Sequence, residues 1–262
     1  MNLHPWNTGF VWTDTGVAAF DRDGFVVVEE LVDEATLAAA RDEIDGFEAE
    51  ADSFLQGVDG GRVSIAETGA ITFSVHLVKR SARLRALSRH PRIVELCAEL
   101  VGPDVNLYWD QAVYKKPEKP RRFPWHQDNG YAYVEPQQYL TVWLALTDAT
   151  VDNGCPWVVP GLHRHGTLRH TYVDPLGYEC LTDPPGAVAA EVGAGGAVVF
   201  SSLTPHLTGP NTTAEVRKAY ILQYAPAGAE ILRGDPAAGP PSHRDRADVP
   251  DRQYPVLRAG RA

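Results

Sequence analysis

The sequence predicts a mainly β protein with a helical cover, in which short strands close into a sandwich or a barrel. From about Val105 onward, short alternating runs are separated by Gly, Pro, Asn and Asp, which is typical of antiparallel β proteins. The first hundred residues carry helix signals instead. The chain has 262 residues, 44% of them hydrophobic, which is enough to bury one sizeable core. We therefore expect a single domain, with a helical and mixed cover (1–104), a β core (105–228) and a Pro/Arg-rich tail (229–262).

The cover is expected to hold one strand and two helices. Residues 25–30 form a short β-branched run. Asp33 is the expected N-cap of the first helix. The apolar positions of that helix recur at helical spacing: Leu37, Ala40, Ile44 and Phe47. The second helix is expected over 91–101, with proline near its start, and the glycine-rich segment 57–69 is expected to be a loop.

The core is expected to hold six or more strands. They cover residues 106–116, 122–128, 139–146, 157–160, 197–202 and 217–224. The third of them has two different faces. Leu140, Val142, Leu144 and Leu146 share one face, and Tyr139, Thr141, Trp143 and Thr147 share the other. A half-polar inner face suits a barrel that encloses a ligand. The tail is expected to wrap the surface or to be partly disordered.

Charge and composition exclude several classes of partner. Lys plus Arg number 24 against 34 Asp plus Glu, a formal charge of −10, which repels nucleic acid. The start, MNLHPWNTGF, lacks the pattern of a signal peptide, and no apolar run is long enough to span a membrane. The three cysteines, Cys97, Cys155 and Cys180, are odd in number and far apart, which indicates reduced thiols. We expect a cytoplasmic protein; the sequence does not indicate its oligomeric state.

The segment FPWHQDNGY (123–131) predicts two metal ligands. On an extended strand the side chains of His126 and Asp128 leave the same face, while Gln127 points the other way. Two imidazoles and one carboxylate form the facial triad that suits Fe(II) and leaves three positions open. His-x-Asp alone is a weak signal, so a third ligand is required. His206, in the turn-rich SLTPHLTGPN, is the best candidate.

An arginine follows this third candidate ligand. Arg217 opens the strand RKAYILQYA, in which Arg217, Ala219, Ile221 and Gln223 share a face. A guanidinium at the mouth of a barrel can pair in bidentate fashion with a carboxylate, and the hydroxyl of Thr208 can add a hydrogen bond. Taken by itself, Arg217 is instead expected in a surface ion pair, for example with Glu215.

These segments together resemble the phytanoyl-CoA dioxygenase family. The resemblance is carried by WHQDNGY, then TVWLALTDATVDNGCPWVVPGLH, then PHLTGPN, then Arg217, and by the opening FDRDGFVVVEELVDEATLAAARDEID. It runs from about Phe20 to about Pro226. It implies a double-stranded β-helix (jelly roll, cupin-like) core and an Fe(II)/2-oxoglutarate-dependent dioxygenase. Such an enzyme uses O₂ and converts 2-oxoglutarate to succinate and CO₂ while it oxidises a primary substrate.

The resemblance also implies roles for single residues. His126, Asp128 and His206 would ligate iron; Arg217 and Thr208 would bind the C5 carboxylate of 2-oxoglutarate; Trp143 would flank the co-substrate. The family often has Ser at Thr208, and PGSH where this chain has PGLH (160–163). Related halogenases lack the carboxylate ligand, so the presence of Asp128 disfavours halogenation.

Further residues are candidates for the cavity or its rim. Gln111 and Lys115 share a face of the strand before the metal motif, and Gln111 is the better candidate for a polar contact with the co-substrate. Otherwise Lys115 and Lys116 form an ordinary solvated pair. Tyr131, Tyr133 and Trp157 are candidates for contact with the substrate, although core packing is the alternative for each. His163, His165 and His170 are expected in a solvated loop, with a rival metal site as the alternative.

Two other functions stay open at this point. A cupin-type metalloenzyme that does not use 2-oxoglutarate would have no need of Arg217, and a non-catalytic jelly-roll binding module would need neither the triad nor the arginine. The expected substrate is a small molecule resembling a natural product. An acyl-CoA is less attractive, because a chain of net charge −10 offers no obvious basic path for its phosphates.

Overall fold

The structure is a computed structural model that describes residues 14–117, 123–131, 133–137, 139–233, 243–246 and 250–261. The prediction about a signal peptide concerns residues 1–10, which lie outside this part of the chain. The helices are α1 (Asp14–Asp23), α2 (Glu34–Gln56), α3 (Leu77–Arg80), α4 (Ala82–Leu87), α5 (Pro91–Leu100) and α6 (Asp128–Tyr131). No helix within the described ranges combines the length and the hydrophobicity that crossing a bilayer requires.

An antiparallel sheet of nine strands forms the centre of the molecule. In spatial order it consists of β1 (Phe25–Val28), β12 (Ala197–Ser201), β7 (Leu140–Ala145), β14 (Arg217–Pro226), β5 (Val105–Lys115), β4 (Ile71–Val75), β3 (Ala66–Glu67) and β2 (Arg62–Val63), and β17 (Tyr254–Leu257) pairs with β5 as well. Four of these strands, β1 to β4, come from the segment predicted as a cover, and β17 comes from the predicted tail. The large sheet therefore extends beyond residues 105–228.

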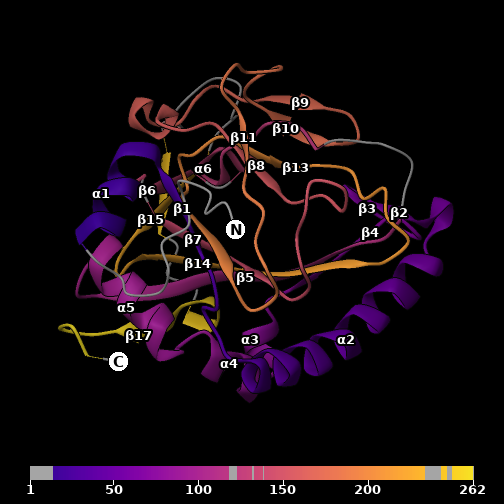
Figure 1. The fold of residues 1–262 in the computed structure, drawn as a ribbon, viewed down its shortest axis with the longest axis horizontal. Coiled ribbons are helices and arrows are strands. Elements are labelled where there is room, and N and C mark those ends of the chain that lie inside the picture. Colours follow the sequence, from indigo (N-terminus) through magenta and orange to yellow (C-terminus); the bar gives the residue numbers. More distant parts are fainter. Residues whose placement is uncertain are drawn as a thin grey trace, which may run out of the picture.

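Smaller sheets lie beside the large one. The first consists of β11 (Val188–Ala189), β8 (Pro156–Val158) and β13 (His206–Thr208). The others are the hairpin of β9 (Thr171–Val173) with β10 (Gly177–Glu179), and the sheet of β6 (Tyr133–Glu135), β15 (Glu230–Arg233) and β16 (His243–Arg246). In Figure 1 the long strands β5 and β14 run between the helices α2 to α5 below and the strands β8 to β11 and β13 above. This is the predicted mainly β fold with a helical cover.

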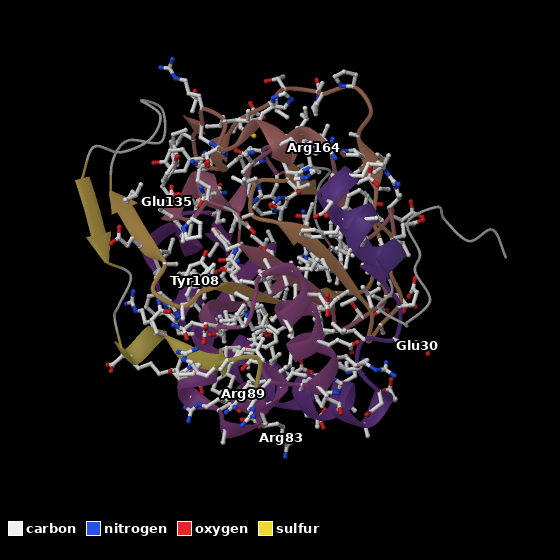
Figure 2. The ribbon with its side chains drawn as sticks, turned by 90° about the vertical axis from the view of Figure 1, so that its left-hand side faces the viewer. Glu30, Arg83, Arg89, Tyr108, Glu135 and Arg164 are labelled. Atoms are coloured by element: carbon white, nitrogen blue, oxygen red, sulfur yellow. The ribbon has the colours of Figure 1, made fainter. Side chains whose placement is uncertain are left out.

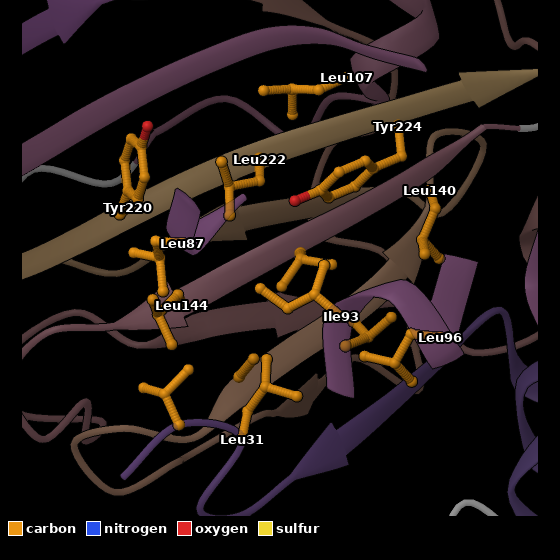
Figure 3. Packing of buried hydrophobic residues seen from close by; sticks show 14 of the residues in the cluster. Leu31, Leu87, Ile93, Leu96, Leu107, Leu140, Leu144, Tyr220, Leu222 and Tyr224 are labelled. Carbon is orange, nitrogen blue, oxygen red and sulfur yellow. The ribbon is translucent and has the colours of Figure 1, made fainter. Parts of the chain in front are cut away.

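The helices cover one face of the large sheet. Figure 3 shows Tyr220, Leu222 and Tyr224 of β14 on this face, close to Leu87 of α4 and to residues of α5. Ile93 and Leu96 of α5 are both fully buried there. Burial of such side chains contributes roughly 1.5–3 kcal/mol each. Arg83 and Arg89 lie on the outer side of the helical layer, at the bottom of Figure 2.

The other face of the large sheet packs against the smaller strands. Trp143 of β7, Phe200 of β12 and Ile221 of β14 share one buried cluster with Val158 of β8. The predicted alternation along β7 is confirmed: Leu140, Val142 and Leu144, with Leu146 just beyond the strand, lie in the helix-side cluster, while Trp143 lies on the inner face. The face of this strand that carries Trp143 therefore lies on the inside of the jelly roll.

The predicted helices are confirmed, and two other predictions need correction. Asp33 caps α2 by accepting a hydrogen bond of 2.8 Å from the backbone N–H of Thr36. The expected loop 57–69 holds the short hairpin of β2 and β3. The tail is not only a surface segment: Val256 and Leu257 of β17 are each 1% exposed. They are buried because β17 covers the part of β5 that β4 leaves unpaired.

Candidate functional site

His126 and His206 pair with each other through their backbones. The N–H of His126 donates to the carbonyl of His206 (2.9 Å), and the N–H of His206 donates back to the carbonyl of His126 (2.8 Å). Directly opposed residues in such a pair hold their side chains on one face. The centres of the two imidazole rings are 4.3 Å apart. Two potential ligands that are distant in sequence thus lie side by side.

Each imidazole is oriented by a carbonyl two residues earlier in the chain. Nδ1 of His126 lies 2.9 Å from the carbonyl oxygen of Pro124, and Nδ1 of His206 lies 2.9 Å from that of Thr204. A neutral ring that donates from Nδ1 presents its Nε2 lone pair on the opposite side. Burial, together with the neighbouring His206, lowers the pKa of His126 well below its ordinary value, which keeps this ring neutral and able to bind a metal.

Asp128 completes the group. Its Oδ1 lies 3.7 Å from Nε2 of His206, and its Oδ2 accepts a hydrogen bond of 2.6 Å from the hydroxyl of Thr141. Ligand atoms of the two histidines and the aspartate all lie within 4.8 Å of one another. Two neutral nitrogens and one carboxylate in this arrangement fit a divalent iron ion and leave open positions.

The chain around Asp128 is not the expected continuous strand. Among the described residues of the predicted strand, 123–128, only Trp125 and His126 form β-bridges, and α6 begins at Asp128; Arg122 lies outside the described residues. The side chain of Gln127 points away from the triad, as predicted. Its amide donates to the carbonyls of Gly166 (3.0 Å) and Leu203 (2.6 Å) and accepts from the N–H of Leu168 (2.7 Å). These bonds hold the turn into α6, so His126 and Asp128 still face the same space.

The histidine-rich segment is not a solvated loop. His163 and His170 are buried, whereas His165 is exposed. Nε2 of His170 accepts a hydrogen bond of 3.1 Å from the N–H of Gln127. The ring therefore holds the backbone between His126 and Asp128. Within the described residues, the triad is the only group of three or more His, Cys, Asp or Glu side chains close enough to hold a metal ion. The rival metal site is therefore not formed.

A glycine makes room for His170. An added Cβ at Gly130 of α6 would lie 2.2 Å from the His170 ring. No side chain larger than hydrogen fits there without displacement of the ring. The sequence placed His170 in a solvated loop and gave no sign of this contact, because the contact joins segments that are distant in sequence and follows no local spacing.

The triad faces a cavity of about 460 Å³, which also holds the predicted anion-binding residues. Arg217 is 1% exposed, so the alternative of a surface residue is wrong. Its guanidinium carbon lies 5.1 Å from the centre of the Trp143 ring. Thr208 and Gln111 line the same cavity. A buried guanidinium and a hydroxyl that line one cavity are suited to bind a carboxylate.

Lys115 is another buried cation, and its prediction as half of a solvated pair is wrong. It lies opposite Arg217 in the pairing of β5 with β14. Its ammonium donates to the carbonyl of Gly209 (2.6 Å) and lies 4.6 Å from the centre of the Phe123 ring. Lys116 is partly buried and pairs with Asp52 (2.6 Å). Lys115 thereby fixes the loop that follows β13.

The structure places the three aromatic candidates for substrate contact in different surroundings. Tyr131 lines the cavity, and its ring centre lies 5.2 Å from that of His126. Its hydroxyl accepts a hydrogen bond of 2.9 Å from the N–H of Tyr178, and burial raises its pKa to about 12. Tyr133 lies on β6, and Trp157 packs beside Leu207 between β11 and β13. Neither of these two lines the cavity.

Several residues of the cavity were not predicted as contacts. Tyr108 and Gln223 line it together, and the Tyr108 hydroxyl donates to Oε1 of Gln223 (3.0 Å). The register of β14 with β5 shifts between Gln223 and Tyr224. Such a bulge places two successive residues on one face, and both Tyr108 and Trp109 line the cavity. Tyr139 and Thr141 lie on the face of β7 that was predicted to be the inner one.

Comparison with solved structures gives the class of protein. The epimerase SnoN, crystallised with Fe³⁺, alpha ketoglutarate (2-oxoglutarate) and nogalamycin RO, superposes with a TM-score of 0.66 at 25% identity, covering 82% of this chain and 84% of SnoN. The fold and the site are those of an Fe/2-oxoglutarate-dependent oxygenase.

Comparison with known sequences gives the family. The model of the phytanoyl-CoA dioxygenase (PhyH) family matches residues 20–219, and the chain belongs to this family. Methylphosphonate hydroxylase of Gimesia maris is 26% identical over 227 residues, which cover 81% of this chain and 80% of that protein. Phytanoyl-CoA dioxygenase domain-containing protein 1 of Danio rerio is 30% identical over 146 residues, which cover 52% of this chain and only 50% of that protein.

Proposed function

We propose that this chain hydroxylates a small molecule resembling a natural product and converts 2-oxoglutarate to succinate and CO₂ in the same turnover. One observation carries the proposal. The ligand atoms of His126, Asp128 and His206 lie within 4.8 Å of one another and line the same cavity as the buried Arg217. The triad alone fits many metalloenzymes, whereas a buried guanidinium beside it provides for an anionic co-substrate.

The residues of the cavity are proposed to have different roles. Nε2 of His126, Nε2 of His206 and Oδ1 of Asp128 would hold Fe(II), which supplies the activation of O₂ when it is bound. Thr141 keeps the other oxygen of Asp128 engaged, so Oδ1 stays directed at the two imidazoles. Nδ1 of each histidine stays bonded to its carbonyl, which fixes both rings before any ligand enters.

Arg217 and Thr208 are proposed to bind the C5 carboxylate of 2-oxoglutarate. Trp143 lies beside the guanidinium and limits the directions that it can take. Gln111 lines the same cavity and is proposed as a further polar contact. The aromatic lining around these groups excludes water and strengthens the ion pair.

The class of substrate is supported by the solved relative and by charge. SnoN was crystallised with nogalamycin RO. The net charge of −10 disfavours nucleic acid and other polyanions as partners. A cytoplasmic enzyme agrees with three free cysteines, of which Cys97 and Cys155 are buried.

The test is the visible charge-transfer band of the Fe(II) chelate of 2-oxoglutarate, recorded without oxygen. The wild-type protein is expected to show the band, and Asp128→Ala is expected to lose both the band and succinate formation. Asp42→Ala, an exposed carboxylate of α2, is the matched control. A cupin-type enzyme that does not use 2-oxoglutarate, or a binding module, would give no band with any variant. Transfer of one atom from ¹⁸O₂ to the product then distinguishes hydroxylation from epimerisation or desaturation.

A further inference from the structure

A second cavity, of about 450 Å³, lies beside the metal cavity. Its lining comes from the C-terminal end of α2, from the β2–β3 hairpin and from strands β4 and β5. In Figure 1 the hairpin lies next to the end of α2, at the right of the molecule. Four residues line both cavities: Ile65, Phe73, Trp109 and Gln111. The two cavities are therefore neighbours with one common wall.

The lining of the second cavity is apolar. Among the described residues that form it, only Ser64 and Gln111 are polar, and none is charged. Three of its side chains are unusually exposed for large hydrophobic residues: Phe54 (64%), Val63 (46%) and Val75 (43%). A group of exposed apolar side chains indicates a binding surface rather than an ordinary face of a soluble protein.

The metal cavity offers little for a charged substrate. Once the triad and Arg217 are assigned to the metal and the co-substrate, no other charged side chain of the described part of the chain lines it. A phosphate, carboxylate or ammonium group on the substrate would lose its hydration there without gaining an ion pair, which is costly. The common wall with the second cavity is itself mostly aromatic and aliphatic.

We propose, on the basis of the proposed function, that the substrate is an elongated, uncharged molecule whose apolar end occupies the second cavity. Its reacting carbon lies at the triad, and the molecule passes Ile65 and Trp109 to reach Phe54 and Val63. The size and concavity of the second cavity fit part of a small molecule rather than the flat surface of a protein partner.

Ile65 lies at the boundary between the two cavities. It lies at the turn of the β2–β3 hairpin, whose base is held by the ion pair of Arg62 with Glu67. An added Cβ at Gly177 of β10 would lie 3.7 Å from Cγ2 of Ile65. The tip of the hairpin thus reaches β10 above the metal cavity, so a bound molecule passes beneath it.

The test uses a series of 4-alkylphenols, from phenol to 4-nonylphenol, as neutral probes. Their binding to the protein loaded with Ni(II) and 2-oxoglutarate is measured by calorimetry. The affinity is expected to rise about three- to fourfold for each added methylene until the second cavity is filled. The 4-alkylbenzoates of equal length are expected to bind more weakly, because their carboxylate finds no cation once 2-oxoglutarate is bound.

Two variants address the second cavity without touching the metal cavity. Val63→Ser makes it polar and Ala51→Phe fills it, and both residues line only this cavity. Both variants are expected to flatten the dependence on tail length and to leave the affinity for phenol within twofold. Val151→Ser, at a valine of similar exposure (43%, against 46% for Val63) in a turn that lines neither cavity, is the matched control.

The outcomes separate this inference from the proposed function. Affinity that does not depend on tail length, or equal behaviour of Val63→Ser and Val151→Ser, overturns the inference even if the 2-oxoglutarate chelate band is present. If the wild-type protein shows no chelate band but its affinity still rises with tail length, the proposed oxygenase function is overturned and the apolar cavity is not.

Discussion

The hydroxyl of Thr141 donates a hydrogen bond of 2.6 Å to Oδ2 of Asp128. Thr141 lies on the central strand β7 and is fully buried. Asp128 lies at the start of the short helix α6. The carboxylate of the proposed metal site is therefore oriented by a buried strand inside the large sheet, and not only by its own segment.

Thr141→Val is expected to weaken metal binding. Valine has nearly the same shape but cannot donate, so the carboxylate loses the bond that orients it. Loss of such an outer contact costs roughly ten- to a hundredfold in metal affinity. Titration with Fe(II) or Ni(II) measures the change, with Thr182→Val at an exposed threonine as control. Equal affinity of Thr141→Val and the wild-type protein would show that the bond has no role.

Arg217→Ala is expected to raise the KM for 2-oxoglutarate. A hydrogen bond to a charged group contributes about 1.5–3 kcal/mol, so we expect an increase of roughly tenfold or more. The KM for the primary substrate should change less than about twofold, because that molecule is bound elsewhere in the cavity. Arg217→Lys keeps the charge but cannot form two parallel hydrogen bonds with a carboxylate. Its KM for 2-oxoglutarate should therefore lie between those of the wild-type protein and the alanine variant. An unchanged KM for 2-oxoglutarate in the alanine variant removes Arg217 from its proposed role.

Gly130→Ala is expected to impair both stability and metal binding. The new Cβ would lie 2.2 Å from the His170 ring, so the ring or α6 has to move. Gly46→Ala in α2 is the control, because nothing lies within 4 Å of its Cβ position. Alanine in the middle of a helix should stabilise by about 0.5–1 kcal/mol. Thermal unfolding and metal titration check the pair; a Gly130→Ala protein that matches the wild type in both would contradict this account.

The metal-free protein is expected to lose stability in mild acid, in part through His170. Burial lowers the pKa of this ring, whereas the pKa in the unfolded chain is about 6.5. Below that pH the unfolded chain takes up a proton that the folded chain refuses, so the free energy of unfolding decreases as the pH falls. One histidine contributes at most about 1.4 kcal/mol per pH unit. Tm should drop between pH 7.5 and 5.5.

His170→Gln provides the comparison for this pH effect. A glutamine oxygen can still accept from the N–H of Gln127 but does not titrate. The drop in Tm should therefore be smaller in this variant than in the wild type, by roughly 2–4 °C for each kcal/mol removed. Identical drops would mean that other groups, such as the buried His163, account for the acid sensitivity.

Much of the site could be predicted because its signals are local. The spacing of His126 and Asp128, the turn residues around His206 and the alternation that places Trp143 and Arg217 on inner faces are all properties of short segments. The structure brings these five side chains to one cavity.

The unpredicted parts depend on contacts between distant segments. Tyr254–Leu257 contains a proline and follows a polar tail, so its sequence gives little sign of a strand; it becomes one because β5 has an open edge there. Asp110 is 1% exposed because it accepts hydrogen bonds from the N–H of Leu77 (2.7 Å) and the hydroxyl of Tyr220 (2.8 Å). The second cavity likewise exists only where α2 meets the β2–β3 hairpin.

The mutual backbone pairing of His126 and His206 also bears on how the protein matures. A chain in which these two segments have not yet met presents the imidazoles separately, and each alone holds a metal ion weakly. Uptake of a metal during refolding therefore reports that the two segments have paired, and its rate should follow this long-range contact rather than the formation of the helices.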